Sequence, residues 1–210
     1  NGTLTLIEQA KKCQEELRFT DAESIDKFRY YRAVVMAFEA INTLADRYSA
    51  LAFEMAEKET DSVRKEELKT IGETCAWVPR HKPRTFREAI QCFWFQFLML
   101  SPSTTLPGGR FDQYMYPYYK ADLEAGRITK EEAIELLCCM RLKDMELNRT
   151  SGKNNRKKNA GFAKWHNFII GGVKPDGTDA TNDLSYMLLD AALITKTPHH
   201  TITLLSLIHI

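Results

Sequence analysis

Residues 25–55 carry the pattern that most constrains the fold of this sequence, because apolar side chains recur there every three or four positions. That spacing places the apolar side chains along one side of an α-helix, and its length predicts a single amphipathic helix of about 30 residues. The residues that form the pattern are Ile25, Phe28, Tyr31, Val35, Phe38, Ile41, Ala45, Tyr48, Ala52 and Met55. The chain is therefore expected to be rich in helix.

Signals for the start of a helix recur along the chain. Capping boxes of the form Thr-x-x-Glu begin at Thr5, Thr20, Thr85 and Thr129, and each precedes a stretch with helical apolar spacing. Further helices are predicted over residues 61–76, 86–100, 111–125, 130–148 and 182–196. The helix over residues 86–100 has almost no polar side, so we expect it to be buried on most sides.

The pattern changes near the C-terminal end of the sequence. Residues 165–171 form a short run with high β-propensity, and residues 201–208 alternate Thr with aliphatic side chains as a strand does. With a helix between them, the two runs predict one β-α-β unit and therefore a parallel sheet. The predicted fold class is α/β and helix-rich, and the glycine-bearing segments 101–110 and 161–172 are the best candidates for a site.

The charge balance argues against nucleic acid and membranes as partners. Lys plus Arg number 29 and Asp plus Glu number 28, a net charge of +1, so no global field attracts a polyanion. The one basic segment holds Lys153, Arg156, Lys157 and Lys158 among asparagines, without aromatic residues. We interpret it as a solvated loop in preference to a phosphate or nucleic-acid contact. No apolar run approaches the roughly 18 residues that a membrane helix requires.

The five cysteines point to a reducing, cytoplasmic compartment, because their number is odd and none lies in a Cys-x-x-Cys pair. Neighbouring residues on a helix point about 100 degrees apart, so Cys138 and Cys139 are interpreted as buried structural thiols and not as a redox pair. His199 and His200 are interpreted as loop or strand-start residues because no second cluster at a ligand spacing accompanies them. From spacing alone, no metal site and no complete catalytic constellation is predicted.

Three longer motifs resemble the glycyl radical enzymes, the family that includes pyruvate formate-lyase. Residues 78–91, VPRHKPRTFREAIQ, resemble the family's VPxxxPxTFxEAxQ stretch, and residues 109–119, GRFDQYMYPYY, are similar to its signature of the same letters. Residues 167–186 are similar to its NxxxGGxxxDGxDxxNxLSY block. The three motifs occur in the family's order, and the resemblance covers roughly residues 61–203.

The resemblance implies part of a ten-stranded α/β barrel that shelters radical chemistry. In the family, an activating enzyme with an iron–sulfur cluster and S-adenosylmethionine creates a backbone glycyl radical. That radical generates a cysteine thiyl, which takes a hydrogen atom from a small-molecule substrate. Exclusion of oxygen and solvent is part of such a mechanism. The resemblance also implies a homodimer of the full-length enzyme, with no cofactor bound directly by this chain.

The sequence departs from the family in two places that matter for catalysis. It contains neither a Gly-Cys-x-Glu-like loop nor an Arg-Val-x-Gly-Tyr-like loop, and none of its cysteines follows a glycine. No catalytic residue is therefore assigned. Residues 1–210 are expected to be a partial domain from the N-terminal half of the enzyme, inactive alone, with its last few residues foreign to the parent protein.

The resemblance carries over three substrate-binding candidates and two structural ones. Thr104 and Thr105 fall where the family places substrate-lining residues, and Trp165 falls where pyruvate formate-lyase has a tryptophan against its substrate. A core aromatic residue is an equally good interpretation of Trp165. Arg110 and Asp112 are expected to fix the turn from the preceding loop into a helix, where a carboxylate near the helix N-terminus is favourable.

The leading functional hypothesis is a fragment of a glycyl radical lyase, a decarboxylase or dehydratase that cleaves a C–C or C–O bond of a small substrate. The hydroxyls of Thr104 and Thr105 suit a polar group on that substrate. The alternative is a non-catalytic α/β interaction module, which the missing radical loops favour.

Overall fold

The computed structural model describes residues 2–20, 22–100, 108–146, 166–197 and 201–206. They form two compact units. The helical unit comprises residues 1–84 and 91–95, and the sheet unit comprises residues 85–90 and 96–210. The helix α4, Phe86–Leu100, contributes residues to both units, and its bounds agree with the sequence prediction.

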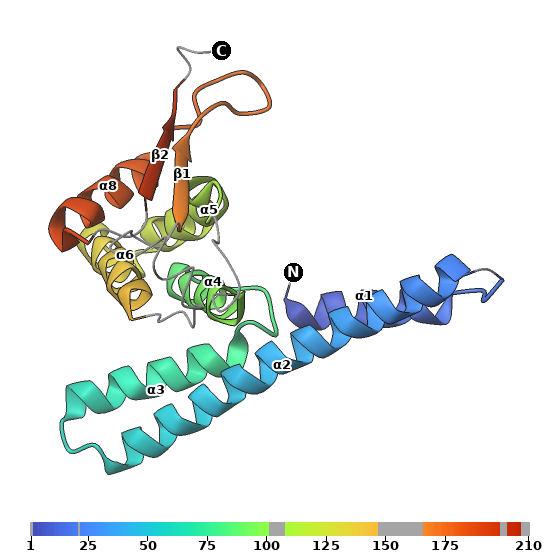
Figure 1. The fold of residues 1–210 in the computed structure, drawn as a ribbon. Helices are drawn as coiled ribbons and strands as arrows, with labels where there is room; N and C mark the ends of the chain where they lie inside the picture. The colour runs from blue at the N-terminus through green and yellow to red at the C-terminus, as the bar shows by residue number, and fades with distance from the viewer. Residues whose placement is uncertain (1, 21, 101–107, 147–165, 198–200, 207–210) are drawn as a thin grey trace, which may run out of the picture. The chain divides into compact units, whose positions relative to one another are not determined.

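The helical unit is built on the predicted long helix. The helices α1, Thr3–Glu15, and α3, Ser62–Trp77, both pack against α2, Ala22–Lys58 (Figure 1). The side of α2 that faces them carries small side chains such as Ala45 and Ala52, which are buried. Small residues let two helix backbones approach closely: the hydroxyl of Ser49 on α2 donates to the Gly72 carbonyl oxygen on α3 at 2.8 Å.

The starts of the helices show which of the predicted capping boxes form. The Thr129 box is confirmed, since the backbone N–H of Glu132 donates to the Thr129 hydroxyl and the Glu132 carboxylate accepts from the Thr129 backbone N–H. The Glu88 backbone N–H likewise donates to the Thr85 hydroxyl, at 3.2 Å. The box at Thr5 was wrong, because α1 begins at Thr3, whose backbone N–H donates to the Pro79 carbonyl oxygen at 2.9 Å. A long-range contact therefore sets the start of α1.

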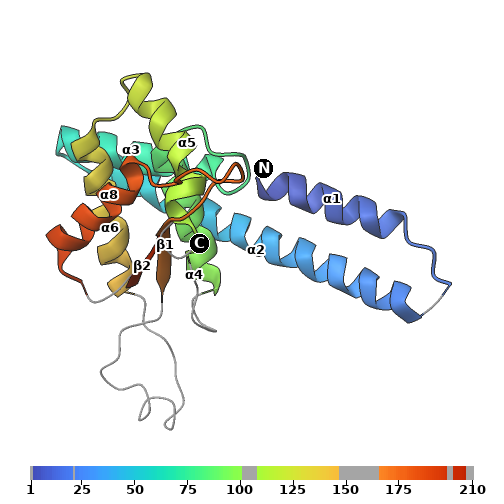
Figure 2. The same ribbon diagram turned by 90° about the horizontal axis from the view of Figure 1, so that it is seen from above.

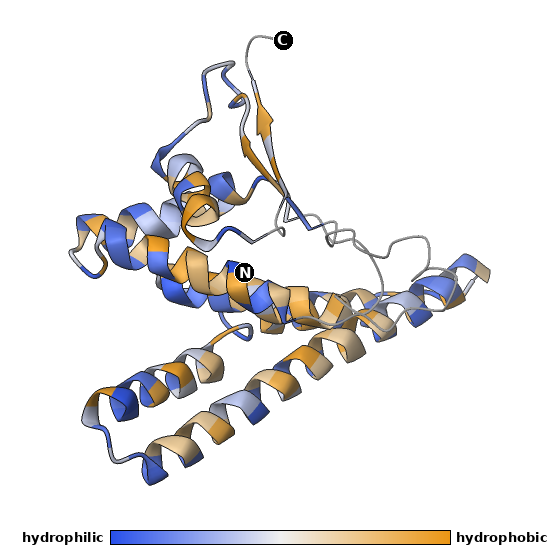
Figure 3. Ribbon diagram, turned by 60° about the vertical axis from the view of Figure 1, so that its left-hand side comes forward, coloured by the Kyte–Doolittle hydropathy of each residue, from blue (hydrophilic) through white to orange (hydrophobic). Residues whose placement is uncertain are grey.

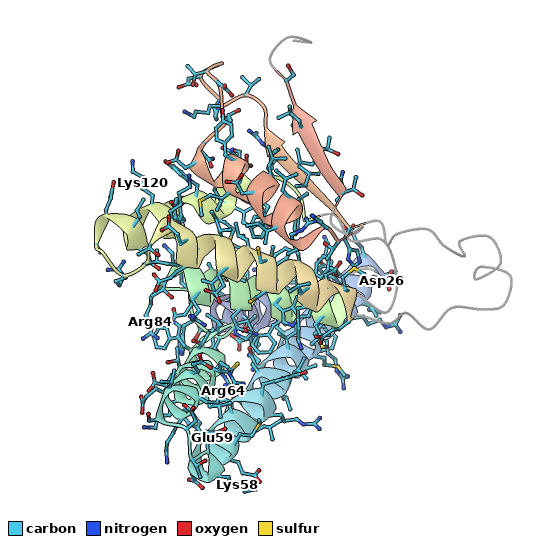
Figure 4. All side chains as sticks on the ribbon, turned by 90° about the vertical axis from the view of Figure 1, so that its left-hand side faces the viewer. Asp26, Lys58, Glu59, Arg64, Arg84 and Lys120 are labelled. Carbon is cyan, nitrogen blue, oxygen red and sulfur yellow. The ribbon has the colours of Figure 1, made fainter. Side chains whose placement is uncertain are left out.

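The connection between α2 and α3 is polar and exposed. The carboxylate of Asp61 caps α3 by accepting from the backbone N–H groups of Val63 and Arg64, at 2.8 and 3.0 Å. Figure 4 labels Lys58 and Glu59 at this connection, and Lys58 donates back to Glu54 on α2.

The sheet unit contains the predicted β-α-β arrangement. The strand β1, Asn167–Gly171, is followed by the helix α8, Asp183–Thr195, and by the strand β2, Thr201–Leu205. The strands pair in parallel, with Asn167 opposite Thr201 and Gly171 opposite Leu205 (Figures 1 and 2). The α/β class predicted from the sequence is thus present in this unit, and the chain as a whole is helix-rich.

Three further helices contribute residues to this unit. They are α4, α5 (Phe111–Glu124) and α6 (Lys130–Met145). On α5, the Phe111 ring lies 4.8 Å, centroid to centroid, from that of Phe168 on β1, and α6 packs against α8. Figure 3 shows that apolar residues also make up much of the two strands. The prediction that α4 is buried on most sides holds for Phe86 and Phe97, whereas Leu100 at its end is 54% exposed.

Candidate active-site segment

The segment of Gly108 and Gly109 lies beside β1 and brings two of the sequence motifs together. The backbone N–H of Gly108 donates to the Asn167 carbonyl oxygen at 2.8 Å, and that of Ile169 donates to the Gly109 carbonyl oxygen at 2.8 Å. Gly109 and Phe168 form a parallel bridge. A Cβ atom on Gly108 would lie 1.8 Å from the Phe168 ring, so only glycine permits this approach. The start of the GRFDQ motif is therefore a sheet neighbour of the NFIIGG motif.

Arg110 and Asp112 hold the far end of β1 from two sides. The Arg110 guanidinium donates from Nη2 to the Gly171 carbonyl oxygen at 2.9 Å and from Nη1 to the Val173 carbonyl oxygen at 3.2 Å. The backbone N–H of Gly171 donates to Oδ2 of Asp112 at 2.7 Å. Gly171 has a φ of +72°, a conformation that favours glycine. We refer to Arg110, Asp112 and Gly171 together as the Gly171 clamp.

The carboxylate of Asp112 also connects the clamp to α8. It is fully buried, and Ser185 donates its hydroxyl to Oδ2 at 2.6 Å. Asn182, the N-cap of α8, donates its side-chain amide to the Asp112 carbonyl oxygen at 3.1 Å. Hydrogen bonds to a buried carboxylate are among the strong ones in proteins. The sequence prediction of a structural role for Arg110 and Asp112 is supported, but their partners lie about 60 to 70 residues away and not in the local turn.

Tyr114 of α5 makes a further contact with the segment beside β1. Its hydroxyl donates to the Gly108 carbonyl oxygen at 2.6 Å. Burial, followed by the negative charge of Asp112, raises the pKa of the Tyr114 phenol well above its usual value. The hydroxyl therefore stays protonated as a hydrogen-bond donor over the physiological pH range.

The opposite end of β1 is held by a buried pair that sequence reasoning did not single out. Nδ1 of His166 lies 2.7 Å from Oδ1 of Asp144 on α6, and both side chains are fully buried. The ring of Phe97 packs edge-on against the His166 ring, with centroids 4.5 Å apart. The two partners are 22 residues apart in the sequence, so no short-range pattern could have predicted the pair.

A second polar side chain of α6 reaches the segment that leads into β2. Arg141 is 2% exposed and donates from Nε to the Thr195 hydroxyl at 3.1 Å and from Nη2 to the Thr197 hydroxyl at 3.2 Å. Burial lowers the pKa of the Arg141 guanidinium. Asp144 and Arg141 thus attach α6 to the chain just before β1 and to the chain that leads toward β2.

The three substrate-binding candidates, Thr104, Thr105 and Trp165, lie outside the described residues. The same holds for the basic segment 153–158 and for His199 and His200. The described residues that flank the candidates are Gly108 and His166.

The interpretation of the adjacent cysteines needs a correction. Cys138 is half-buried, with its sulfur 3.9 Å from the Ala191 carbonyl oxygen, but Cys139 is exposed. Consecutive positions on α6 face different directions, so only Cys138 points toward α8. Burial raises the pKa of the Cys138 thiol. Both are free thiols, and among the described residues no group of three or more His, Cys, Asp or Glu side chains is arranged to hold a metal ion.

We expect Cys139 to react with a thiol reagent much faster than Cys75. Cys75 is 2% exposed, and burial raises the pKa of its thiol to about 11, so its thiolate fraction at pH 8 is about a thousandth. Labelling of the folded 210-residue chain with N-ethylmaleimide, followed by peptide mass spectrometry, measures both rates. A Cys139→Ser variant should lose the fast label, and equal labelling rates at Cys75 and Cys139 would contradict the described burial.

In the described part of the chain, no helix combines the length and the apolar character needed to cross a membrane.

Comparison with known proteins identifies relatives along nearly the whole chain. A family model described as pyruvate formate lyase-like matches residues 1–206. An isethionate sulfite-lyase of Nitratidesulfovibrio vulgaris is 42% identical over 176 residues, which are 80% of this chain and 21% of the relative. A trans-4-hydroxy-L-proline dehydratase of Clostridioides difficile is 34% identical over 195 residues, which are 90% of this chain and 25% of the relative.

Solved structures show the same fold. A Roseburia inulinivorans structure concerned with 1,2-propanediol dehydration matches with a TM-score of 0.92 and 38% identity, covering 97% of this chain and 26% of that one. The glycerol-bound B12-independent glycerol dehydratase of Clostridium butyricum matches with a TM-score of 0.90 and 34% identity, with the same coverage. The chain thus spans about a fifth to a quarter of the length of the relatives that it matches.

Proposed function

The chain belongs to the pyruvate formate lyase-like family of glycyl radical enzymes, and from this premise we propose that it is an N-terminal-half segment of a lyase that acts on a small hydroxylated substrate. The observation that carries the proposal is the family match over residues 1–206. The reaction proposed is radical cleavage of a C–O or C–C bond, as in a dehydratase or a decarboxylase, or of the C–S bond that breaks when isethionate loses sulfite.

The substrate class rests on what the relatives act on. Glycerol, 1,2-propanediol and trans-4-hydroxy-L-proline, which the relatives' descriptions name, each carry an aliphatic hydroxyl group. Isethionate, a hydroxyethanesulfonate, carries one as well. A site for such molecules needs polar side chains that bind a hydroxyl, because a buried polar group that loses its partner discriminates strongly between substrates.

In this proposal Thr104, Thr105 and Trp165 line the substrate. Nearby residues in the sequence support this proposal, since Gly108 and Asn167 are hydrogen-bonded neighbours on adjacent parallel segments. Thr105 precedes Gly108 by three residues and Trp165 precedes Asn167 by two. At roughly 3.6 Å per residue, these chain lengths of about 11 and 7 Å allow the three side chains to converge on one place.

The chemistry would depend on parts of the enzyme that these residues do not include. A glycyl radical, installed by an activating enzyme with S-adenosylmethionine and an iron–sulfur cluster, would supply hydrogen-atom abstraction through a cysteine. This chain's share of the work is to bind and orient the substrate and to keep water from it. We propose the cytoplasm as its location and a homodimer as the form of the full-length enzyme.

A substrate panel tests this function. The full-length protein is activated without oxygen by its activating enzyme and incubated with glycerol, 1,2-propanediol, isethionate or trans-4-hydroxy-L-proline. We expect conversion of at least one compound, only after activation. A protein that carries the radical but converts none of the four would contradict the substrate class. A protein that never carries the radical would instead favour the non-catalytic interaction module.

A further inference from the structure

The two faces of β1 differ in what they contact. Phe168 and Ile170 are buried, and the Phe168 ring packs against Phe111 of α5. Side chains alternate along a strand, so Asn167 and Ile169 lie on the opposite face, where both are partly exposed. Parallel strands are generally covered on both faces and built from apolar residues. An asparagine at the start of such a strand is therefore unusual.

Asn167 is held in place by a residue of the neighbouring strand. Thr203 pairs in register with Ile169, so it lies on the same face of the sheet as Asn167. Its hydroxyl donates to Oδ1 of Asn167 at 3.0 Å. Among the residues that the structure describes, the amide nitrogen of Asn167 makes no hydrogen bond. With its oxygen occupied, the amide presents two N–H donors on the partly exposed face of β1.

The position of Asn167 connects this face to the proposed substrate site. Its backbone carbonyl oxygen accepts from the N–H of Gly108, which follows the segment of Thr104 and Thr105. In the sequence it follows Trp165 by two residues. A donor that is covered by the rest of the enzyme needs a partner, because a buried polar group without one is unfavourable.

We propose that the side-chain amide of Asn167 binds a hydroxyl oxygen of the substrate and that Thr203 is the positioning residue that orients this amide. The inference rests on the proposed function and assigns the recognition of its hydroxylated substrate to two named side chains. Asn167 donates through Nδ2, and Thr203 keeps the amide from rotating by occupying Oδ1.

Binding measurements on the full-length, unactivated protein test this assignment without any turnover. Calorimetry measures the Kd of whichever of the four compounds above the activated protein converts. We expect Asn167→Ala to raise Kd by about tenfold or more and Thr203→Val by a smaller factor. Asn167→Asp keeps the volume and the acceptor for Thr203 but removes the donor, so it should raise Kd as well. Thr201→Val is the matched control, since Thr201 also lies on β2, on the same face, and should leave Kd unchanged.

A second comparison separates recognition from a merely structural role. For a site that turns over 1,2-propanediol, 1-propanol is the matched probe that lacks one hydroxyl. Wild-type protein should prefer the diol, and Asn167→Ala should lose most of that preference while its melting temperature stays near that of Thr201→Val.

The outcomes are distinct for the two proposals. An unchanged Kd in both Asn167 variants, in a protein whose wild type binds and converts the substrate, would overturn the role of Asn167 and leave the proposed function standing. A lowered melting temperature with an unchanged Kd would also overturn it. A wild-type protein that binds none of the four compounds would overturn the substrate class and this inference with it.

Discussion

Replacing Asp112 with alanine is expected to release the end of β1 and to raise the hydrogen-exchange rate of the Gly171 amide by about tenfold to a hundredfold. The substitution removes the acceptor for the Gly171 N–H and for the Ser185 hydroxyl, both within a buried corner. Leaving a buried donor without a partner costs about 1–3 kcal/mol, and each 1.4 kcal/mol corresponds to a tenfold change in the local opening equilibrium. The effect should spread to α8, because Ser185 lies in its first turn.

Hydrogen exchange with mass spectrometry on the full-length protein measures this change in the peptide that contains Gly171. Ser185→Ala is the matched control, since it removes one of the two donors and leaves the bond from Gly171 intact, and its effect on that peptide should be small. Asp112→Asn keeps one acceptor oxygen and should fall between the two. Exchange at Gly171 that is as slow in Asp112→Ala as in the wild type would show that the clamp does not stabilise this end of β1.

Replacing Trp165 with alanine is expected to reduce kcat/KM of the activated full-length enzyme by at least about tenfold while changing its melting temperature little. A ring that lines the substrate positions the reacting atoms, so its loss affects turnover more than stability. A ring that fills the core would instead cost about 3–5 kcal/mol of stability when truncated.

A buried residue of β1 provides a matched control for this substitution. Phe168 is fully buried against Phe111, so Phe168→Ala should lower the melting temperature strongly. Phe168→Ala should therefore lose mainly stability, whereas Trp165→Ala should lose mainly activity. If Trp165→Ala lost as much stability as Phe168→Ala, with unchanged kinetics in the folded remainder, Trp165 would be a core residue and its assignment to the substrate site would fail.

Most helices and both strands could be predicted from local patterns. The apolar repeat of α2 extends over many turns, and Asp61 and Thr129 supply the side-chain oxygens that cap α3 and α6. The strands on either side of α8 allowed the parallel pairing to be predicted, because a helix between two strands is typical of a parallel crossover. These features depend on residues within a few positions of one another.

The polar contacts that hold β1 could not be predicted in the same way. Asp112 joins residues that come 59 and 73 positions later, and Asp144 joins His166 across 22 positions. Such pairs depend on the tertiary fold and leave no periodic signal. Local patterns also gave a wrong prediction. The apolar sequence neighbours of Cys139 indicated burial, but its direction on α6 exposes it.

The claim that this chain is part of a glycyl radical enzyme is tested most directly by electron paramagnetic resonance. The full-length protein, treated anaerobically with its activating enzyme and S-adenosylmethionine, should show the doublet of a glycyl radical. The 210-residue chain treated in the same way should show none, because it contains no Arg-Val-x-Gly-Tyr-like loop. A full-length protein that remains silent, or a doublet that arises from the 210-residue chain alone, would contradict this account.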